Sequence, residues 1–507
     1  MVDKQTAPET AQTFWRRHRL MIVALGIVLL IVLYVAGVRS NPPGFYLDES
    51  SIAYNAHTIS QTGHDEFGVS WPLYFRAFGE YKNPTYVYLL AALYRLTGPS
   101  IFVARALSVA LGLLAAFLLG VLAWQMTRQR RIGLLVGVIA LFTPWFLELS
   151  RLVVEVALYP LALALFLLVL HRASNKVRWS QFEIVGLALA LGLLTYAYSI
   201  GRLLAPLLAL GLFFFVTRTR VIAIVETWTF YALTLIPLLI FNQRHPGALL
   251  TKFRWATYIT PESTPVQIAS EFGKHYLANL SPFSLLLSGD SNQVIHIPSM
   301  GSLLIAPALM IAAGIVLVLR RYRHDPWWRF VLFGAVVSIV PASLTRDQFP
   351  SLRLIALPVF LLMFSIPVFA WLLQRSSTNV RRTVLALVIL ATVLQAAIFQ
   401  WQFHRTYRNS STRLAVFDAG YPDLLTAATS AGKPIYLTDP PSNPGYIQAY
   451  WYGTLRGLDV SRSFVRLPSD ARAPSGAVVI TGAENPPDGK IIARSGPYTV
   501  YIAADAQ

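Results

Sequence analysis

The chain is organised by apolar runs that short polar segments separate. Eleven of these runs approach or exceed the roughly 20 apolar residues that a helix needs to cross a bilayer. The first run has no small-residue cleavage site at its end, so it is predicted to be a membrane helix and not a signal peptide. The runs lie near residues 20–38, 101–125, 132–147, 152–171, 182–198, 202–217, 221–241, 302–320, 329–344, 352–374 and 381–401.

The connections between these runs alternate in charge. Every second connection carries at least two Lys or Arg residues: WRRHR, TRQRR, HRASNKVRW, RTR, RRYRHDPWWR and QRSSTNVRR. Because cytoplasmic loops are enriched in Lys and Arg, this pattern places the N-terminal segment, 1–19, in the cytosol. Eleven crossings from 20 to 401 then leave the C-terminus outside, in the periplasm or extracellular space.

Three longer polar segments fall on the outer side. Two are loops, at 39–100 and 242–301, and the third is the tail, 402–507. Within the first loop, residues 83–98 are apolar but short, so they are predicted to lie at the interface or to re-enter. The tail alternates short apolar runs (PIYLTD, GAVVITG and YTVYIA) with turn residues, which predicts a small extracytoplasmic α/β domain. The predicted fold class is therefore an all-α polytopic membrane protein with such a domain at its C-terminus.

Composition excludes several classes of protein. Hydrophobic residues make up 55% of the chain and charged residues only 13%, which does not fit a set of soluble domains. The net charge of +18 is spread between the apolar runs, so it does not indicate a nucleic-acid partner. The chain has no Cys, hence no disulfides or thiolate metal sites, and no nucleotide, zinc-protease or serine-hydrolase motif.

The first outer loop concentrates the residues that could do chemistry. Asp48 and Glu49 precede SSIAYNAHTIS, a predicted helix start, so one interpretation is that they cap this helix. Glu80 and Lys82 follow in the same loop, just before the interfacial segment. Charged groups at the bilayer surface are costly unless they bind something. The second interpretation is therefore a site for an anionic, lipid-borne group together with a base.

The order of these elements resembles a known family. The stretch from LDESSIAYNAHTIS through FRAFGEYKNPTYVYLL to GPSIFVARALS is similar to the first periplasmic loop of bacterial polytopic glycosyltransferases of the C-type fold. The nearest resemblance is to protein mannosyltransferases and the lipid A aminoarabinose transferases. TPWFLELSRLVVEVALYP, YSIGRLLAPL, LANLSPFSLLLSGD and PASLTRDQFPSLRLIALP match in order, so the resemblance covers nearly the whole membrane part. In the tail only KPIYLTDPPSNPGYIQAYWYG is similar.

The resemblance implies roles for individual residues. Asp48 matches the catalytic base that takes a proton from the acceptor hydroxyl, and Glu49 is the adjoining acid of the motif. Glu80, in a supporting role, and Lys82 match an E-x-K element that relatives follow with Pro-Pro. Here Asn83 stands where relatives have the first proline, so this chain departs from the family's pattern directly after Lys82.

Some relatives pair the glutamate with a histidine on a divalent metal. His245, His275 and His296 are candidates for that partner, but a solvated or packed histidine is the favoured interpretation of each. No metal ligand is assigned, and a divalent metal is the one cofactor left open.

Physical chemistry agrees with a polyprenyl-phosphate sugar as donor. Its tail must lie in the bilayer and its head group at the outer interface, where fixed cations would stabilise the leaving phosphate. Arg353, at the start of an outer helix, is the first choice for such a cation, and Arg346 the second. Arg151 and Arg202 are alternatives, with a snorkelling interfacial role at least as favoured.

The predicted function is that of a cell-membrane (inner-membrane) glycosyltransferase. It would transfer a hexosyl or pentosyl group, with inversion, to a hydroxyl of a glycan, lipid or protein acceptor. A lipid-linked glycan transporter or flippase is one alternative, but transporters place ionisable residues at helix centres, whereas here they lie in loops. A glycan ligase is the other alternative, and only the resemblance argues against it.

Overall fold

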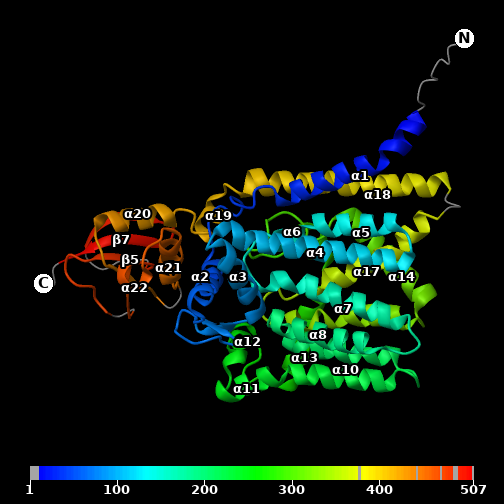
Figure 1. Cartoon of the computed structure of the whole chain (residues 1–507), viewed down its shortest axis with the longest axis horizontal. Helices are drawn as coiled ribbons and strands as arrows, with labels where there is room; N and C mark the ends of the chain where they lie inside the picture. Colours follow the sequence, from blue (N-terminus) through cyan, green and yellow to red (C-terminus); the bar gives the residue numbers. More distant parts are fainter. Residues whose placement is uncertain (1–10, 375–377, 441–442, 469–470, 484–488, 505–507) are drawn as a thin grey trace, which may run out of the picture.

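The computed structural model describes residues 11–374, 378–440, 443–468, 471–483 and 489–504. The long helices lie side by side in a bundle, with the C-terminal sheet domain at one end (Figure 1). Helices α2 (Leu47–Thr62), α3 (Pro84–Thr97) and α12 (Thr251–Ala256) lie at that same end. Residues 1–10 of the predicted cytosolic segment fall outside the described residues.

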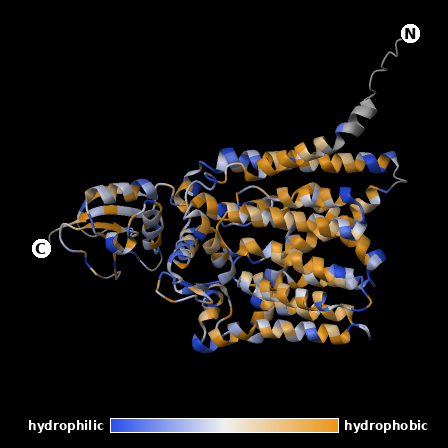
Figure 2. Ribbon diagram, viewed as in Figure 1, coloured by the Kyte–Doolittle hydropathy of each residue, from blue (hydrophilic) through white to orange (hydrophobic). Residues whose placement is uncertain are grey.

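Each predicted apolar run coincides with one or two helices, and Figure 2 shows that these helices carry most of the hydrophobic residues. An α-helix satisfies its own backbone hydrogen bonds, as a chain in hydrocarbon must. The bundle helices are α1 (Ala11–Val35), α4 (Ile101–Thr127), α5 (Arg130–Phe142), α7 (Tyr159–Ser174), α8 (Gln181–Ala197), α9 (Gly201–Leu210), α10 (Val221–Thr234), α11 (Ile236–Arg244), α14 (Ile305–Leu317), α15 (Pro326–Val337), α17 (Ala356–Leu372) and α18 (Asn379–Trp401).

Within the described residues, six helical segments are long and apolar enough to cross a membrane. They are Ile101–Thr127, Glu155–Ser174, Val221–Arg244, Ile305–Tyr322, Pro326–Ser343 and Asn379–Tyr407. Four apolar helices are shorter: Ala24–Val35, Gln181–Ala197, Gly201–Phe215 and Ala356–Leu372. The polytopic fold class is thus confirmed, while the number of about eleven crossings stays a prediction.

Close helix packing depends on small residues. A Cβ at Gly120 of α4 would lie 2.7 Å from the carbonyl oxygen of Gly133, and a Cβ at Gly133 of α5 would lie 2.6 Å from that of Gly120. Only glycine allows this approach, as is common between membrane helices. Pro144 then ends α5 and starts the short helix α6 (Pro144–Leu149), because proline cannot continue the α5 hydrogen-bond ladder.

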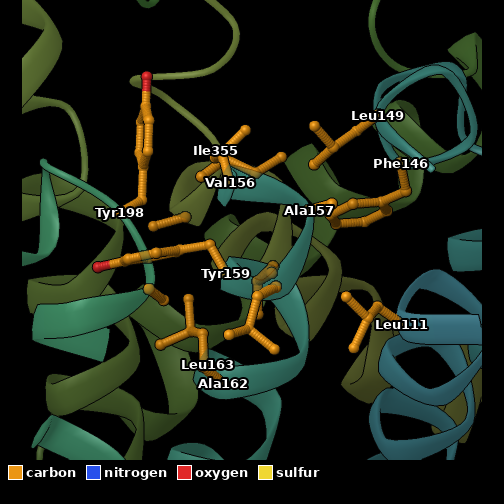
Figure 3. Close-up of a cluster of buried hydrophobic side chains, with 14 of the residues drawn as sticks. Leu111, Phe146, Leu149, Val156, Ala157, Tyr159, Ala162, Leu163, Tyr198 and Ile355 are labelled. Atoms are coloured by element: carbon orange, nitrogen blue, oxygen red, sulfur yellow. The ribbon is translucent and has the colours of Figure 1, made fainter. Parts of the chain in front are cut away.

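A buried apolar cluster supports the end of the bundle that carries the charged loops. Figure 3 shows side chains from several segments of the chain meeting in this cluster, among them Leu149 of α6, Val156 of the 3₁₀ helix η1 (Glu155–Leu158), Tyr159 of α7 and Ile355. These four residues are 3% exposed or less. The cluster fixes η1, whose first residue is Glu155.

Arg151 does not occupy the interfacial position expected from the sequence. Its side chain is fully buried, and its guanidinium donates to the carbonyl oxygens of Ala36, at 2.9 Å, and of Tyr34. A buried Arg needs such acceptors, and here they are the free carbonyls near the C-terminal end of α1. The snorkelling interpretation of Arg151 is therefore wrong, and the residue joins α1 to the bundle.

The C-terminal domain contains a five-stranded sheet with the order β4-β3-β5-β7-β6. Strand β3 (Ile435–Thr438) pairs in parallel with β4 (Phe464–Leu467) and β5 (Val478–Thr481), and β7 (Tyr498–Ala503) is antiparallel to β5 and β6 (Gly489–Ser495). The predicted β-like runs are β3, β5 and β7, so this sheet domain is confirmed. Its helices are α19 (Ser411–Val416), α20 (Tyr421–Ala431), α21 (Tyr446–Leu455) and α22 (Val460–Ser463).

Candidate active site

Asp48 lies in the first turn of α2 and forms an ion pair with Lys82. The helix begins at Leu47, earlier than the sequence predicted, so both carboxylates lie inside its first turn. Asp48 Oδ1 is 2.7 Å from Lys82 Nζ. The Asp48 side chain is 36% exposed and that of Lys82 only 4%, so the aspartate is the accessible member of the pair.

A small β-hairpin presents Lys82 and Glu80 together. Strands β1 (Phe75–Ala77) and β2 (Glu80–Lys82) are joined by Phe78 and Gly79, which have φ values of 53° and 81°. Positive φ at both central residues is the geometry of a tight hairpin turn. Because side chains alternate along a strand, Glu80 and Lys82 share one face, with their charged atoms 3.8 Å apart.

Lys252 completes a row of four alternating charges. Its Nζ lies 3.0 Å from Glu80 Oε1, so the sequence of contacts is Asp48, Lys82, Glu80 and Lys252. Lys252 belongs to α12, in the second predicted outer loop, and 36% of its side chain is exposed. Sequence reasoning missed this residue, because one Lys in a long loop carries no signal of its partner.

The neighbouring charges shift the pKa values of Asp48 and Lys82 in opposite directions. Burial raises the pKa of Asp48, but the ammonium groups of Lys82 and Lys252 outweigh that effect and leave the pKa below its ordinary value. Burial lowers the pKa of Lys82, but Asp48 and Glu80 outweigh it and raise the pKa overall. Asp48 is therefore a carboxylate, and Lys82 an ammonium, at neutral pH.

The structure gives a reason for Asn83, which stands where relatives have a proline. Its backbone N–H donates to the carboxylate of Glu155, which is only 6% exposed. A proline at this position has no N–H to donate. The hairpin is thus tied to the bundle at the point where the sequence has Asn instead of Pro, and Lys82 keeps its place beside Asp48.

Glu49 has quite different surroundings from Asp48. It is fully buried, and its carboxylate accepts hydrogen bonds from the backbone N–H groups of Tyr46, at 2.9 Å, and Val153, at 3.0 Å. Arg105 of α4 donates to the same carboxylate at 3.2 and 3.4 Å. The bond from Tyr46 is a helix cap, so the capping interpretation fits Glu49, whereas the Asp48 carboxylate pairs with Lys82.

The two arginines chosen from the sequence lie in the connection between α15 and α17, away from this row of charges. Arg346 anchors the end of α12, donating its backbone N–H to Ala256 and Nε to Thr257, each at 2.8 Å. Arg353 pairs with Asp347 and also donates to the Thr345 hydroxyl at 3.1 Å. In the described part of the chain, neither forms a hydrogen bond or ion pair with Asp48, Glu80 or Lys82.

The three candidate histidines do not join Glu80. His296 pairs with Glu148, with 2.6 Å between Nδ1 and Oε2; burial lowers its pKa, but Glu148 outweighs this and raises the pKa to about 9. His275 stacks on Tyr258, and His245 lies against Phe241. The described residues contain no group of three or more metal-ligating side chains. Because Glu80 is already paired with two ammonium groups, its surroundings do not fit a divalent cation.

The fold, a helical bundle with a sheet domain at one end, is similar to solved structures of C-type glycosyltransferases. A crystal structure of ArnT from Cupriavidus metallidurans bound to undecaprenyl phosphate superposes with a TM-score of 0.60 at 13% identity, covering 96% of this chain and 99% of that one. The apo ArnT structure gives 0.58 at 14% identity, covering 96% and 100%. The archaeal oligosaccharyltransferase AglB from Archaeoglobus fulgidus, in complex with an inhibitory peptide and a dolichol-phosphate, gives 0.54 at 13% identity, covering 89% and 64%.

The sequence itself points the same way. Residues 81–243, about a third of the chain, match the family described as dolichyl-phosphate-mannose-protein mannosyltransferase. This segment begins inside strand β2 and includes Lys82. No curated protein matches the chain. The resemblance to the mannosyltransferase and aminoarabinose-transferase group is thereby confirmed.

Proposed function

We propose that the protein is an integral-membrane glycosyltransferase that moves a sugar from a polyprenyl-phosphate donor to an acceptor hydroxyl. The observation that carries this proposal is the accessible Asp48 carboxylate beside Lys82, at the end of an apolar bundle. A carboxylate can act as general base, and an ammonium can bind the leaving phosphate. ArnT with undecaprenyl phosphate and AglB with dolichol-phosphate share the fold, which supports a lipid phosphate as the donor group.

The proposed reaction is a single displacement. The acceptor oxygen forms a bond to the anomeric carbon while the bond from that carbon to the phosphate oxygen breaks. Asp48 takes the hydroxyl proton, and the bonding electron pair leaves with the polyprenyl phosphate. A single displacement at the anomeric carbon inverts its configuration, so we propose an inverting transfer.

Donor binding would also activate the base. The Asp48 pKa is low because Lys82 and Lys252 are close to it. A phosphate that binds these two cations would neutralise part of their field, so the pKa of Asp48 would rise and its proton affinity increase. We therefore assign the phosphate to Lys82 and Lys252, with Arg353 and Arg346 as the alternatives. Glu80 keeps both lysines in position, and Glu49 orients α2.

The test uses the full chain in detergent with a radiolabelled polyprenyl-phosphate sugar. Lys82→Met and Lys252→Met should each weaken donor binding about 10- to 100-fold, as expected when a charge-assisted hydrogen bond is lost. Lys274→Met is the control, because Lys274 lies in the same predicted outer loop but is 67% exposed and pairs with Glu271. If both test variants bind donor normally, the phosphate assignment moves to Arg353 or Arg346. If the wild type releases no sugar, the proposed function is wrong.

The site is proposed to face away from the cytosol, in the cell membrane. The alternating Lys and Arg content of the loops supports this orientation. A reporter that is active only outside the cytosol, fused after Gln507, should be active. Activity of a cytosolic reporter at the same position would reverse the orientation.

A further inference from the structure

One buried side chain of the C-terminal domain forms hydrogen bonds with the start of α2 and the residues just before it. Gln448, on α21, is fully buried. Its Oε1 accepts a hydrogen bond from Ser50 Oγ at 2.6 Å, and its Nε2 donates to the Phe45 carbonyl and to Asp418 Oδ2, each at 2.7 Å. Both amide hydrogens and the amide oxygen are thus used.

Aromatic contacts of α21 extend this interface beyond Gln448. The ring of Trp451 stacks on that of Phe45, with the ring centroids 5.6 Å apart. The ring centroids of Tyr450 and Tyr54 are 5.4 Å apart. Phe45 precedes α2 and Tyr54 is near its middle, so the domain contacts both the entry and the body of the helix. Large apolar rings fix the separation of two elements, while a hydrogen-bonded amide fixes their register and rotation.

Three successive residues of α2 point in three directions. Successive side chains on an α-helix are about 100° apart. Glu49 bonds to Arg105 in the membrane bundle, and Ser50 bonds to Gln448 in the C-terminal domain. Asp48 points away from both of these contacts, toward Lys82 on the accessible side of the helix. The contacts of Glu49 and Ser50 therefore hold the first turn of α2 and, with it, the Asp48 carboxylate.

We infer that Gln448 is a positioning residue for Asp48, and that the C-terminal sheet domain is part of the catalytic unit through this contact. The inference rests on the proposed function, because it assigns Asp48 the role of base. A misplacement of about 1 Å can lower an enzymatic rate on the order of 100-fold. Loss of the Gln448 contacts would free the first turn of α2 to shift relative to Lys82.

The first measurement is the kinetics of Gln448→Leu, which keeps the approximate volume but none of the hydrogen bonds. We expect kcat to fall about 10- to 100-fold with little change in the donor KM. The acid limb of the pH–rate profile should move to higher pH, because an Asp48 farther from Lys82 loses the interaction that lowers its pKa. A purely structural Gln448 would lower the amount of folded enzyme without moving that limb.

Two further variants control for misfolding. Ser50→Ala removes only the α2 side of the contact and should give a smaller change in the same direction. Thr454→Val changes a hydroxyl on the same helix that bonds to its own helix, at the Tyr450 carbonyl, and should leave kcat and the pH profile unaltered. A normal pH profile in both Gln448→Leu and Ser50→Ala would overturn the inference.

The second measurement does not depend on catalysis. Hydrogen–deuterium exchange of the full chain should be faster at the start of α2 in Gln448→Leu, with α3 unchanged. If the wild type proves inactive on polyprenyl-phosphate sugars, the proposed function fails, yet this exchange still reports whether Gln448 fixes α2. Unchanged exchange at 47–53 would show that the helix is placed without Gln448.

Discussion

The two sides of α2 carry neighbouring carboxylates in opposite surroundings. On the accessible side, Asp48 pairs with Lys82 alone among the described residues, and more than a third of its side chain is exposed. On the bundle side, Glu49 is fully buried and receives hydrogen bonds from two backbone N–H groups and from Arg105. Arg105 also donates to the carbonyl oxygens of Pro42, at 2.8 Å, and Gly44.

This difference separates a carboxylate suited to react from one suited to hold structure. The oxygens of Glu49 are occupied by donors, so a proton from a substrate cannot reach them without breaking the network. Asp48 keeps an accessible carboxylate and a partner whose field a bound phosphate would alter. We therefore propose different roles for these two adjacent carboxylates, on the basis of their burial and their hydrogen-bond and ion-pair partners.

The largest expected effect separates the two carboxylates by turnover. Asp48→Asn keeps size but cannot accept the proton, so turnover should fall about 10²- to 10⁴-fold while donor binding persists. Glu49→Gln should lower turnover per folded molecule much less. Single-turnover sugar transfer, normalised to folded enzyme, measures both. Near-normal turnover of Asp48→Asn combined with a lower melting temperature would instead make Asp48 structural.

The next effect concerns stability, and here we expect the change at Glu49 to cost more than the change at Asp48. Glu49→Gln leaves the buried Arg105 guanidinium without a counter-ion, which costs about 3–5 kcal/mol in comparable buried pairs. We expect a much larger drop in melting temperature for Glu49→Gln than for Asp48→Asn, because Asp48 is partly exposed. Thermal unfolding in detergent measures this. Equal shifts for the two variants would remove the distinction between the two sides of α2.

The sequence predicted the membrane part of the fold well, because length and hydropathy of a run suffice to indicate a helix in a bilayer. It predicted β3, β5 and β7 from short apolar runs between turn residues but missed β4 and β6. The missed strands have weaker patterns: β6 is largely exposed and includes Gly489, Lys490 and Arg494. Such a strand is stabilised by its pairing with β7, which is not visible locally.

The sequence predicted only those residues of the candidate site that lie in the first outer loop. Asp48, Glu80 and Lys82 lie within the first loop and come together as expected, although their roles remain proposals. Lys252 comes from the second loop and Gln448 from the tail, so only the fold brings them to α2. Arg353 was chosen from its place at a loop–helix boundary, and that criterion could not reveal its pairing with Asp347.

A smaller effect tests how the accessible side is tied to the bundle. Asn83→Pro suits the local backbone, where φ is −75°, but removes the N–H that bonds to Glu155. The variant should lose about 1–3 kcal/mol of stability, the cost of leaving a buried acceptor unpaired. Asn83→Ala retains the N–H and serves as control. If both variants unfold alike, the Glu155 contact contributes nothing measurable.

The smallest effect concerns pH and the domain that contacts α2 from outside the bundle. Burial raises the pKa of Asp418 from its ordinary value of 3.8 to about 7, although hydrogen bonds from Gln448 and Tyr498 oppose the rise. The folded chain therefore binds this proton more tightly than the unfolded chain between about pH 4 and 7. The stabilisation that Asp418 contributes is complete below pH 4 and is lost as the pH rises through 7.

Asp418→Asn should flatten the decline of melting temperature between pH 5 and pH 8 by a few degrees. Asp423→Asn, at a carboxylate in the first turn of α20, is the control. An identical decline in wild type and Asp418→Asn would mean that Asp418 remains ionised in the folded chain and that Gln448 bonds to a permanent carboxylate.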